Sequence, residues 1–436
     1  MSEQNKPLSS FLSNILGGGT PAKNTTSYWN GNIPWASVKD FEDNQFELVE
    51  VEDFITEEGL KNSSSKLIPA GIPLLCTRMA VGRSSITIVP TAINQDVKAL
   101  FLKERELDPR YLVRCLHQLQ EKLERISVGS TVKGITLKQI KDLVIFVPDI
   151  NEQKTIAVIL DTLDEAISAT EDLLAKQEKM KQGLLQDLLT RGIDENGQLR
   201  SHWDEQPDLY RRTELGWIPK AWEAKTINDL AVHVGSGVTP RGGSNVYRSS
   251  GILFIRSQNV TFQGLKLNDV AFIDLVTHQN MESSEIVPHD VLLNITGASI
   301  GRCCPVPASF GVANVNQHVC AIRLPEANKT DAYFLSLVLS SYIGQNQIAR
   351  FNAGGNREGL NYQQIRSFLI PWPDYPEREK ITEHLVVQED ENIVVFQELG
   401  KLKKIKTGLM QDLITGRRRV TPELIQQVET LTRSAD

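Results

Sequence analysis

Two long segments of the chain carry apolar residues at alternating steps of four and three, a spacing that gathers them on one narrow seam of a helix. The first segment carries Ile156, Leu160, Leu163, Ile167, Leu174, Leu184 and Leu188. The second carries Ile381, Leu385, Val395, Leu399, Leu402, Leu409 and Leu413. This pattern is typical of coiled-coil helices and predicts them over residues 149–191 and 374–416. Polar residues such as Lys181 and Lys406 interrupt the seam, and groups of this kind fix the register of paired helices at some cost in stability.

A single helix of this kind would expose its apolar seam to water, whereas two in one chain can cover each other. An antiparallel pairing starts the second helix near the end of the first, so that the connections stay short. We therefore expect two long antiparallel helices, joined by a polar connector over residues 192–222.

The sequence ahead of each helix has a different texture, with short apolar runs separated by Gly, Pro, Asn and Ser. This texture predicts mixed strands and short helices over residues 1–148 and 223–373. Each region ends in a strand-like run, at 143–148 and at 368–373. The expected fold class is α/β in the mixed α+β sense, with two globular domains, two long helices and a C-terminal tail at 417–436.

The two halves of the chain are copies of one another. Gly129 corresponds to Gly354, 225 positions on, and KMKQGLLQDLLT (179–190) keeps the same offset from KIKTGLMQDLIT (404–415). Such self-similarity predicts a tandem repeat related by a pseudo-twofold axis. The globular regions have diverged much more than the helices, so we expect two different surfaces on equivalent frames.

Composition narrows the class of protein. The 436 residues contain no apolar run near the roughly 18 that a membrane helix needs, and the first ten lack the pattern of a signal peptide. Five cysteines without a CxxC pair argue against a disulfide framework or a zinc site and favour the reducing cytoplasm. The net charge of −7 means that nucleic-acid binding would need local basic patches and positive charge from a partner.

Motifs for catalysis are missing from the sequence. There is no GxxxxGK[ST] phosphate loop, no Asn/Asp-Pro-Pro-aromatic tetrapeptide and no histidine pair at metal-binding spacing. The run PDINEQK (148–154) is explained by a strand end followed by a helix start. His318, in the run NQHV, is interpreted as a structural strand residue. We therefore expect a chain that is not an enzyme and that binds neither metal nor cofactor.

Several of these segments together resemble the specificity subunits of type I restriction–modification systems. The first half carries a GGTP turn (18–21), IPWASVKD (33–40), the run at 129–140, a strand ending in Val-Pro and a helix that opens with EQKTI (152–156). The second half repeats them, with EREKI at the helix start and Phe254 in place of Trp35. The first half lacks a counterpart of GWIPKAWE (216–223), so its N-terminus is shorter or is completed by the tail, Val420–Asp436.

The resemblance implies a non-catalytic, sequence-specific DNA-binding subunit. Each globular domain would read one half of an asymmetric bipartite site on double-stranded DNA. The helix seams would pair, set the spacing of the half-sites and dock two modification subunits. Those partners would hold S-adenosylmethionine for adenine methylation, and restriction subunits would use ATP and magnesium.

Base and phosphate recognition favours Arg, Lys, Asn and Gln on firm loops. The candidates in the first domain are Lys23, Tyr28, Lys39, Arg78, Arg83 and Lys133. Those in the second are Thr239, Arg241, Arg256, Asn259, Arg302, Asn356 and Arg357. Any one of them could instead be an ordinary surface residue. The pairs Asn94–Gln95 and Asn316–Gln317 recur, and hydrogen bonding at a strand edge explains them as well as base reading does.

Two rival functions stay open at this point. A coiled-coil scaffold that binds only proteins would suit the acidic net charge, and it predicts no sequence-dependent DNA affinity. A self-sufficient methyltransferase–nuclease is disfavoured by the missing motifs, and a methylation assay on the isolated chain distinguishes it.

Overall fold

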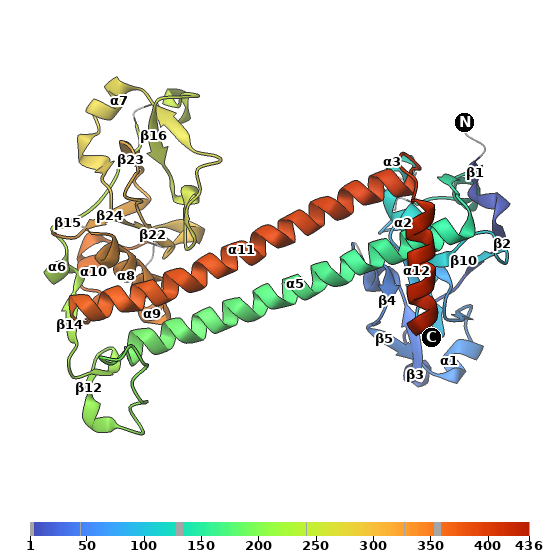
Figure 1. Cartoon of the computed structure of the whole chain (residues 1–436), viewed down its shortest axis with the longest axis horizontal. Helices are drawn as coiled ribbons and strands as arrows, with labels where there is room; N and C mark the ends of the chain where they lie inside the picture. The colour runs from blue at the N-terminus through green and yellow to red at the C-terminus, as the bar shows by residue number, and fades with distance from the viewer. Residues whose placement is uncertain are drawn as a thin grey trace. The chain divides into compact units, whose positions relative to one another are not determined.

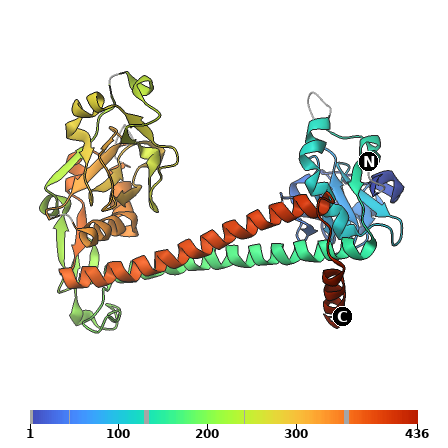
Figure 2. The same cartoon turned by 45° about the horizontal axis from the view of Figure 1, so that its top comes forward.

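The computed structural model describes residues 4–43, 45–127, 134–240, 242–326, 328–352 and 359–435. Two compact units make up the chain (Figures 1 and 2). Unit 1 comprises Met1–Asp172 and Gln397–Asp436, and unit 2 comprises Leu173–Phe396. This division cuts through both long helices, so that each unit holds one end of each. The domain boundaries expected from the sequence, which separate the helices from the globular regions, stay a prediction.

Unit 1 contains two main sheets and a strand pair. The five-stranded sheet has the order β2 (Leu12–Gly17), β10 (Val97–Leu102), β7 (Pro73–Cys76), β8 (Ser84–Thr87), β4 (Glu47–Leu48). The four-stranded sheet has the order β5 (Asp53–Ile55), β3 (Trp29–Ala36), β9 (Thr91–Ile93), β6 (Lys66–Ile68). Strand β1 (Asn5–Pro7) pairs with β11 (Val144–Phe146). The short helices are α1 (Glu57–Lys61), α2 (Pro109–Gln118), α3 (Gln120–Ile126) and α4 (Leu137–Lys141).

Unit 2 repeats this arrangement. One sheet has the order β15 (His233–Ser236), β24 (Val319–Arg323), β21 (Val291–Asn294), β22 (Cys303–Pro305). The other has the order β19 (Ala271–Ile273), β16 (Ile252–Ile255), β23 (Ala313–Val315), β20 (Glu285–Ile286). The strand pairs are β14 (Glu223–Thr226) with β25 (Leu369–Trp372), β12 (Tyr210–Thr213) with β13 (Gly216–Pro219), and β17 (Val260–Thr261) with β18 (Gly264–Leu265). The short helices are α6 (Ile227–Leu230), α7 (Leu275–Gln279), α8 (Lys329–Ser340), α9 (Tyr342–Asn352) and α10 (Tyr362–Arg366).

The strand registers confirm the duplication residue by residue. Each unit has one parallel pairing in its four-stranded mixed sheet, between β3 and β9 and between β16 and β23. Trp35 lies opposite Ala92, as Phe254 lies opposite Asn314. The expected mixed α+β fold with two equivalent globular domains is therefore confirmed, including the replacement of Trp35 by Phe254.

The two long helices are α5 (Ile150–Thr190) and α11 (Tyr375–Ile414), and α12 (Pro422–Ala435) follows the second. Asp149 starts α5 by accepting hydrogen bonds at Oδ1 from the backbone N–H groups of Asn151 and Glu152, both at 3.1 Å. Asp374 accepts the equivalent bond from Glu377 N–H at 3.0 Å. A carboxylate at this position also suits the positive end of the helix dipole.

In unit 1 the start of α5 packs against the end of α11, side by side in both views (Figures 1 and 2). The predicted seam residues of this unit are all buried or half-buried: Ile156, Leu160, Leu163, Ile167, Leu399, Leu402, Leu409 and Leu413. Met410 and Ile414 are buried too, because this end of α11 also contacts the globular core. The antiparallel pairing expected from the sequence is confirmed.

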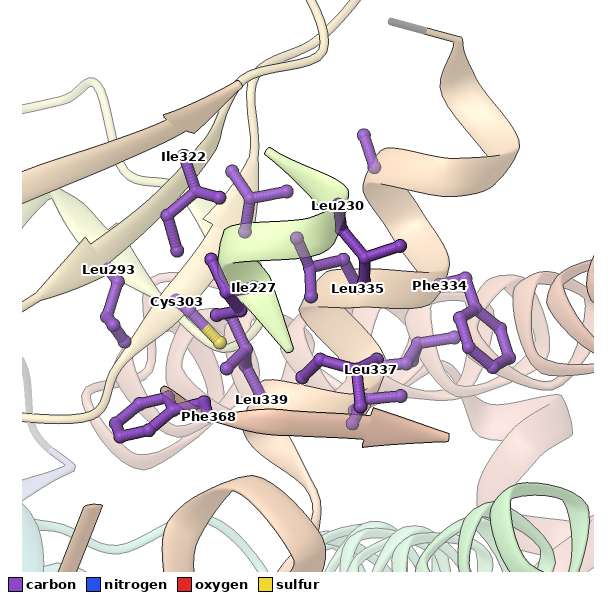
Figure 3. Close-up of a cluster of buried hydrophobic side chains, with 14 of the residues drawn as sticks. Ile227, Leu230, Leu293, Cys303, Ile322, Phe334, Leu335, Leu337, Leu339 and Phe368 are labelled. Carbon is purple, nitrogen blue, oxygen red and sulfur yellow. The ribbon is translucent and has the colours of Figure 1, made fainter. Parts of the chain in front are cut away.

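In unit 2 the end of α5 and the start of α11 join the core of the second domain. Figure 3 shows part of that core, in which Phe334 and Leu335 of α8, Phe368 and the sheet residue Ile322 belong to one apolar cluster. Seam residues Leu188, Ile381 and Leu385 belong to the same apolar cluster. The remaining seam residues, Leu174, Leu184 and Val395, are half-buried. Among the described residues, no helix is long and apolar enough to cross a membrane.

The lysines that interrupt the seam have acidic partners on the facing helix. Lys406 of α11 pairs with Asp164 of α5 in unit 1. In unit 2, Lys181 pairs with Glu389 at 3.2 Å between Nζ and Oε1. Each acid also binds a residue of its own globular domain, since Asp164 accepts from Arg114 and Glu389 from Tyr333 Oη. The polar breaks in the seam therefore connect the helix pair to the domain beside it.

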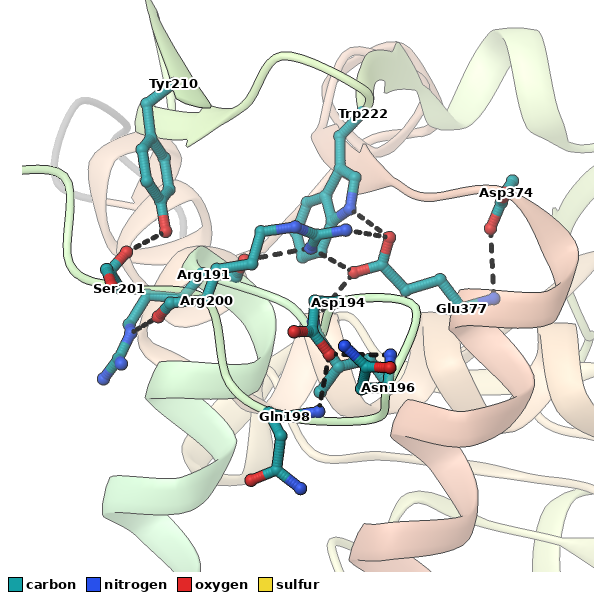
Figure 4. A network of polar contacts seen from close by, with 11 residues as sticks. Arg191, Asp194, Asn196, Gln198, Arg200, Ser201, Tyr210, Trp222, Asp374 and Glu377 are labelled. Carbon is teal, nitrogen blue, oxygen red and sulfur yellow. Dashed lines mark hydrogen bonds and ion pairs between the residues drawn. The ribbon is translucent and has the colours of Figure 1, made fainter. Parts of the chain in front are cut away.

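A glutamate in the first turn of each long helix, buried in unit 1 and half-buried in unit 2, holds the segment that follows the other helix. In unit 2, Glu377 accepts hydrogen bonds from Ile193 N–H and Trp222 Nε1, both at 2.9 Å, and pairs with Arg200 (Figure 4). In unit 1, Glu152 accepts from Val420 N–H at 3.1 Å and pairs with Arg419. The tail after α11 thus makes contacts in unit 1 that the connector makes in unit 2.

Candidate nucleic-acid interface

A turn containing glycine, threonine and proline directly follows strand β2 in unit 1 and strand β15 in unit 2. Gly18 lies so close to β9 that a Cβ there would be 1.8 Å from the carbonyl oxygen of Ile93. Gly237 would place a Cβ 1.6 Å from the oxygen of Val315 on β23. No other residue fits at either position. The glycines therefore bring Thr20 and its counterpart Thr239 next to the turns that follow β9 and β23.

Those next turns contain the recurring Asn–Gln pairs. Asn94 is 5% exposed, and its Oδ1 accepts from Asp96 N–H at 2.9 Å. Asn316 is 8% exposed, and its Oδ1 accepts from His318 N–H at 3.1 Å. The two asparagines thus act within the chain, as the strand-edge interpretation expected. The glutamines that follow them behave differently, because both are exposed.

Gln95 and Gln317 are each held by a threonine and by the residue that follows. Thr20 Oγ1 donates to Gln95 Oε1 at 2.7 Å, and Thr239 Oγ1 donates to Gln317 Oε1. Gln95 Nε2 donates to Asp96 Oδ2 at 3.4 Å. The Nε2 atom of Gln317 lies 2.9 Å from Nε2 of His318.

The loop after β7, and after β21, completes the arrangement. Thr77 N–H donates to the oxygen of Asp96 at 2.8 Å, as Ile295 N–H donates to that of His318 at 3.0 Å. The carbonyl oxygen of Thr77 accepts from Ile135 N–H at 2.9 Å, and that of Ile295 accepts from Leu360 N–H at 2.8 Å. We call this set of joined loops the turn cluster: residues 18–21, 77–83, 94–96 and 134–135 in unit 1, and 237–240, 295–302, 316–318 and 359–360 in unit 2.

Equivalent positions of the turn cluster carry different side chains. Arg78 is 63% exposed, with Nη1 3.8 Å from Oδ1 of Asp96. Its counterpart in the hydrogen-bond pattern is Thr296, whose Oγ1 lies 2.5 Å from Nδ1 of His318. One unit therefore presents a cation and a carboxylate where the other presents a hydroxyl and an imidazole. Such differences are what two readers of different sequences need.

Arg83 and Arg302 occupy matching places after the loop glycine, but their surroundings differ. Each donates its backbone N–H into the loop and accepts at its oxygen from the preceding strand. The Arg83 guanidinium is held by Asp43 at 2.9 and 3.0 Å and by the Phe41 oxygen at 2.8 Å. Arg302 is exposed, and within the described ranges its guanidinium has no ion-pair partner. Arg302 is thus the freer of the two to meet a phosphate or a base.

The other first-domain candidates are not gathered in the turn cluster. Lys39 forms ion pairs with Glu52 at 2.6 Å and Asp53 at 2.9 Å, which raise its pKa above the ordinary value. Lys23 is exposed and Tyr28 half-buried, both in the segment after the Gly–Thr–Pro turn. Their contact with DNA stays a prediction.

In the second domain the structure gives Asn259 a different role from the one expected. Asn259 is 2% exposed, and its amide bonds to Arg256 N–H and to the oxygens of Lys266 and Asp269. A buried amide whose hydrogen bonds are all made within its own loop stabilises the shape of that loop. This corrects the expectation that Asn259 contacts DNA. Arg256 is half-buried, donates to the Asp269 oxygen at 3.1 Å and lies over the ring of Tyr247.

Four candidates, Lys133, Arg241, Asn356 and Arg357, lie outside the described residues. Several residues of the turn cluster were absent from the candidate set, namely Thr20, Gln95, Asp96, Gln317 and His318. The recurrence of Asn–Gln in both halves was the signal that pointed to them. Within each Asn–Gln pair the asparagine is buried and the glutamine is exposed, so only the glutamine is accessible to DNA. The sequence pattern does not reveal which of the two is exposed.

The surface has little that points to chemistry of its own. Within the described part of the chain, no group of three His, Cys, Asp or Glu side chains could hold a metal ion. All five cysteines are free and buried. Burial raises the pKa of Cys304 to about 12, so this thiol stays protonated and unreactive at neutral pH.

Comparison with known proteins identifies what this duplicated frame is similar to. A family model described as "Type I restriction modification DNA specificity domain" matches residues 10–178 and again residues 219–397. The MjaIX type I specificity subunit of Methanocaldococcus jannaschii is 26% identical over 94% of this chain and 92% of its own. The EcoR124I/EcoR124II specificity subunit of Escherichia coli is 35% identical over 38% of this chain and 42% of its own.

Solved structures support the fold. The S subunit of a type I restriction–modification system from M. genitalium has a TM-score of 0.57 at 16% identity, covering 96% of both chains. A chain from a study of complex assembly in the type I R-M system has a TM-score of 0.58 at 13% identity, covering 94% of this chain and 97% of that one. Since the two matches of the family model together cover most of the sequence, the chain belongs to the family of type I restriction–modification DNA specificity domains.

Proposed function

We propose that this chain is the sequence-specific DNA-binding subunit of a type I restriction–modification complex, in which each globular domain reads one half of an asymmetric bipartite site. The observation that carries the proposal is the turn cluster. The backbone hydrogen bonds that join its loops through Thr77 in unit 1 recur through Ile295 in unit 2. Arg78 and Asp96, in contrast, are replaced by Thr296 and His318. Equivalent frames with different side chains suit two half-sites of different sequence.

The long helices set the distance between the half-sites in this proposal. Helix α5 runs without a break from Ile150 to Thr190, and α11 from Tyr375 to Ile414. Each contributes one end to each unit. A continuous helix has a fixed rise of about 1.5 Å per residue, so its length transmits a defined spacing.

The helices are also the proposed docking surface for two modification subunits. In unit 2, Val387, Val394 and Phe396 of α11 are 59–65% exposed, and Met180 of α5 is 57% exposed. Exposed apolar groups of this size on a helix favour a protein partner. The partners would also supply positive charge that a chain of net charge −7 lacks for DNA binding.

The catalytic chemistry belongs to those partners. Modification subunits would bind S-adenosylmethionine and methylate adenine, and restriction subunits would use ATP and magnesium to translocate and cleave. The chain itself would be non-catalytic, and the complex would work in the cytoplasm, where the five free thiols stay reduced.

Sequencing of adenine methylation tests the proposal. Cells that express this chain with its modification subunit would be compared with cells that lack only this chain. A split, asymmetric motif that disappears without the chain is the expected result. Unchanged methylation would contradict the proposal and favour a scaffold that binds only proteins.

A further inference from the structure

The most specific feature of the turn cluster is an exposed glutamine whose amide is fixed in direction. Gln95 and Gln317 are exposed, whereas their neighbours in the two turns are buried or half-buried. Each follows a buried asparagine that caps the turn from within. The glutamine side chains are held by hydrogen bonds at both amide atoms, which is uncommon for a long polar side chain on a surface.

The neighbours of Gln95 determine which way its amide points. Carboxylate oxygens accept hydrogen bonds, so the NH₂ group of Gln95 faces Asp96. The amide oxygen then faces Thr20, whose hydroxyl donates to it at 2.7 Å. The orientation therefore follows from the chemistry of the partners as well as from the atom positions.

In unit 2 different neighbours give the same orientation. Thr239 donates to the amide oxygen of Gln317, so the NH₂ group faces Nε2 of His318. The other ring nitrogen of His318, Nδ1, lies 2.5 Å from Thr296 Oγ1. A carboxylate oxygen in one unit and an imidazole nitrogen in the other thus lie at the same place beside the glutamine.

Each fixed amide keeps half of its hydrogen-bonding capacity. A primary amide has two N–H donors and two acceptor lone pairs. The contacts within the turn cluster use one donor and one acceptor. Among the described residues neither amide has a further hydrogen bond, so one N–H and one lone pair stay available on each. An amide N–H and an amide oxygen together complement the major-groove edge of adenine, which presents an N7 acceptor and an N6 donor.

We propose that Gln95 and Gln317 each read an adenine in the major groove, one in each half-site. The inference rests on the proposed function and adds to it a residue and a base. Most of the turn cluster differs between the units, so a reader that both retain suits a base that both half-sites contain. A neutral, bidentate amide suits a base edge better than a phosphate, for which exposed Arg78 and Arg302 are better placed.

The fixed geometry explains why the side chain is held before DNA arrives. A free glutamine loses rotamer freedom when it binds, which weakens its contribution. Here the loss is incurred on folding, and Thr20 and Asp96 keep the amide in place. Thr20→Val removes the hydroxyl that holds Gln95 and leaves the glutamine itself in place. This variant therefore tests whether Thr20 positions Gln95.

The test uses the assembled complex with its modification subunits. Competition binding would compare DNA that contains the motif found by methylation sequencing with DNA in which single bases of that motif are changed. The comparison is made for the wild type, Gln95→Ala and Gln317→Ala. We expect Gln95→Ala to lose roughly 10- to 100-fold of discrimination at one adenine of its half-site, with the other half-site unaffected. Gln317→Ala does the reverse, and Thr20→Val gives a smaller loss at the same position as Gln95→Ala.

DNA with 7-deazaadenine at that position supplies an independent readout, because it lacks the N7 acceptor. It should weaken binding by the wild type and leave binding by Gln95→Ala unchanged. Uniform weakening over all sequences would overturn the inference and make the glutamines phosphate contacts. A wild-type motif without an adenine in each half-site would also overturn it while leaving the proposed function intact. Absence of any bipartite motif in the wild type would instead defeat the proposed function.

Discussion

Lys181 of α5 and Glu389 of α11 form an ion pair across the helix seam of unit 2, with 3.2 Å between Nζ and Oε1. The residues 225 positions away, Lys406 and Asp164, form the same pair in unit 1 with the helices exchanged. The duplication therefore places one lysine and one acid in each copy, and antiparallel pairing brings each lysine to the acid of the other copy. A shifted register would leave charges unpaired on an apolar seam.

Substitution of Lys181 tests this role. Lys181→Met should lower the free energy of unfolding by about 1–3 kcal/mol, because Glu389 keeps its charge in a half-buried place. Denaturant unfolding followed by circular dichroism measures the change. Lys401→Met is the matched control, since Lys401 is 69% exposed on α11 and, among the described residues, forms its ion pair with Glu398, one turn away on the same helix. Equal effects of the two substitutions would rule out a special role for the seam pair.

The glutamate at the start of each long helix leads to a second prediction. Glu377→Gln removes the charge that holds Arg200 and the connector (Figure 4). The loss of a charge pair whose side chains are only 11% and 17% exposed predicts a destabilisation of up to about 3 kcal/mol and faster cleavage of residues 192–222 by a protease. Glu383→Gln changes an exposed position of the same helix, so the protease should cleave this variant at the wild-type rate. Equal cleavage of both variants would show that Glu377 does not hold the connector.

His117 predicts a pH dependence for unit 1. Burial, with smaller contributions from Arg114 and Lys406, lowers the pKa of His117 to about 4. In the unfolded chain this pKa is about 6.5, so the unfolded state binds more protons between these values. Stability should therefore fall as the pH drops from about 6.5 to about 4, by at most about 3 kcal/mol from this residue. His117→Gln, unfolded over the same range, should lose less stability, and parallel curves for the two proteins would contradict the prediction.

The two matching arginines predict opposite phenotypes. Arg302→Ala should weaken DNA binding by the complex and reduce the slope of log affinity against log salt by about 1 if Arg302 meets a phosphate. Arg83→Ala should mainly destabilise unit 1, because it removes the guanidinium that bonds to the Phe41 oxygen and to Asp43, which keeps its weaker bond from Gln120. Salt titrations of binding and unfolding curves for both variants measure the difference. A loss of affinity for Arg83→Ala alone would reverse the assignment.

The helices and the duplication could be predicted from the sequence because both depend on local spacing. The seam from Ile156 to Leu188 follows from a repeat along the chain, and the expected helix ends lie within two residues of α5 and α11. Burial of Leu185 and Met410 could not be predicted in the same way, because it arises from the globular domains that pack beside the seam.

The candidate site was less predictable, since it depends on partners far away in the sequence. Arg83 and Arg302 occupy similar positions in the sequence, yet their surroundings differ. The guanidinium of Arg83 is held by Asp43, which lies 40 residues away in the sequence. Asn259 has the residue type of a base reader, but the fold buries it among the carbonyl groups of its own loop. Gln95 is held in place by a hydrogen bond from Thr20, 75 residues earlier. Contacts of this range follow from the fold and not from a local pattern.

The central claim, one reader in each unit, is tested most directly by a chain with two copies of the first reader. Strand pairs β1–β11 and β14–β25 are equivalent, so residues 5–146 can replace residues 224–371 at matching positions. Assembly of the chimera with the modification subunit is checked first, and its adenine methylation is then sequenced. The account predicts an inverted repeat of the first half-site with the wild-type spacing. Methylation of the original asymmetric motif by this chimera would contradict it.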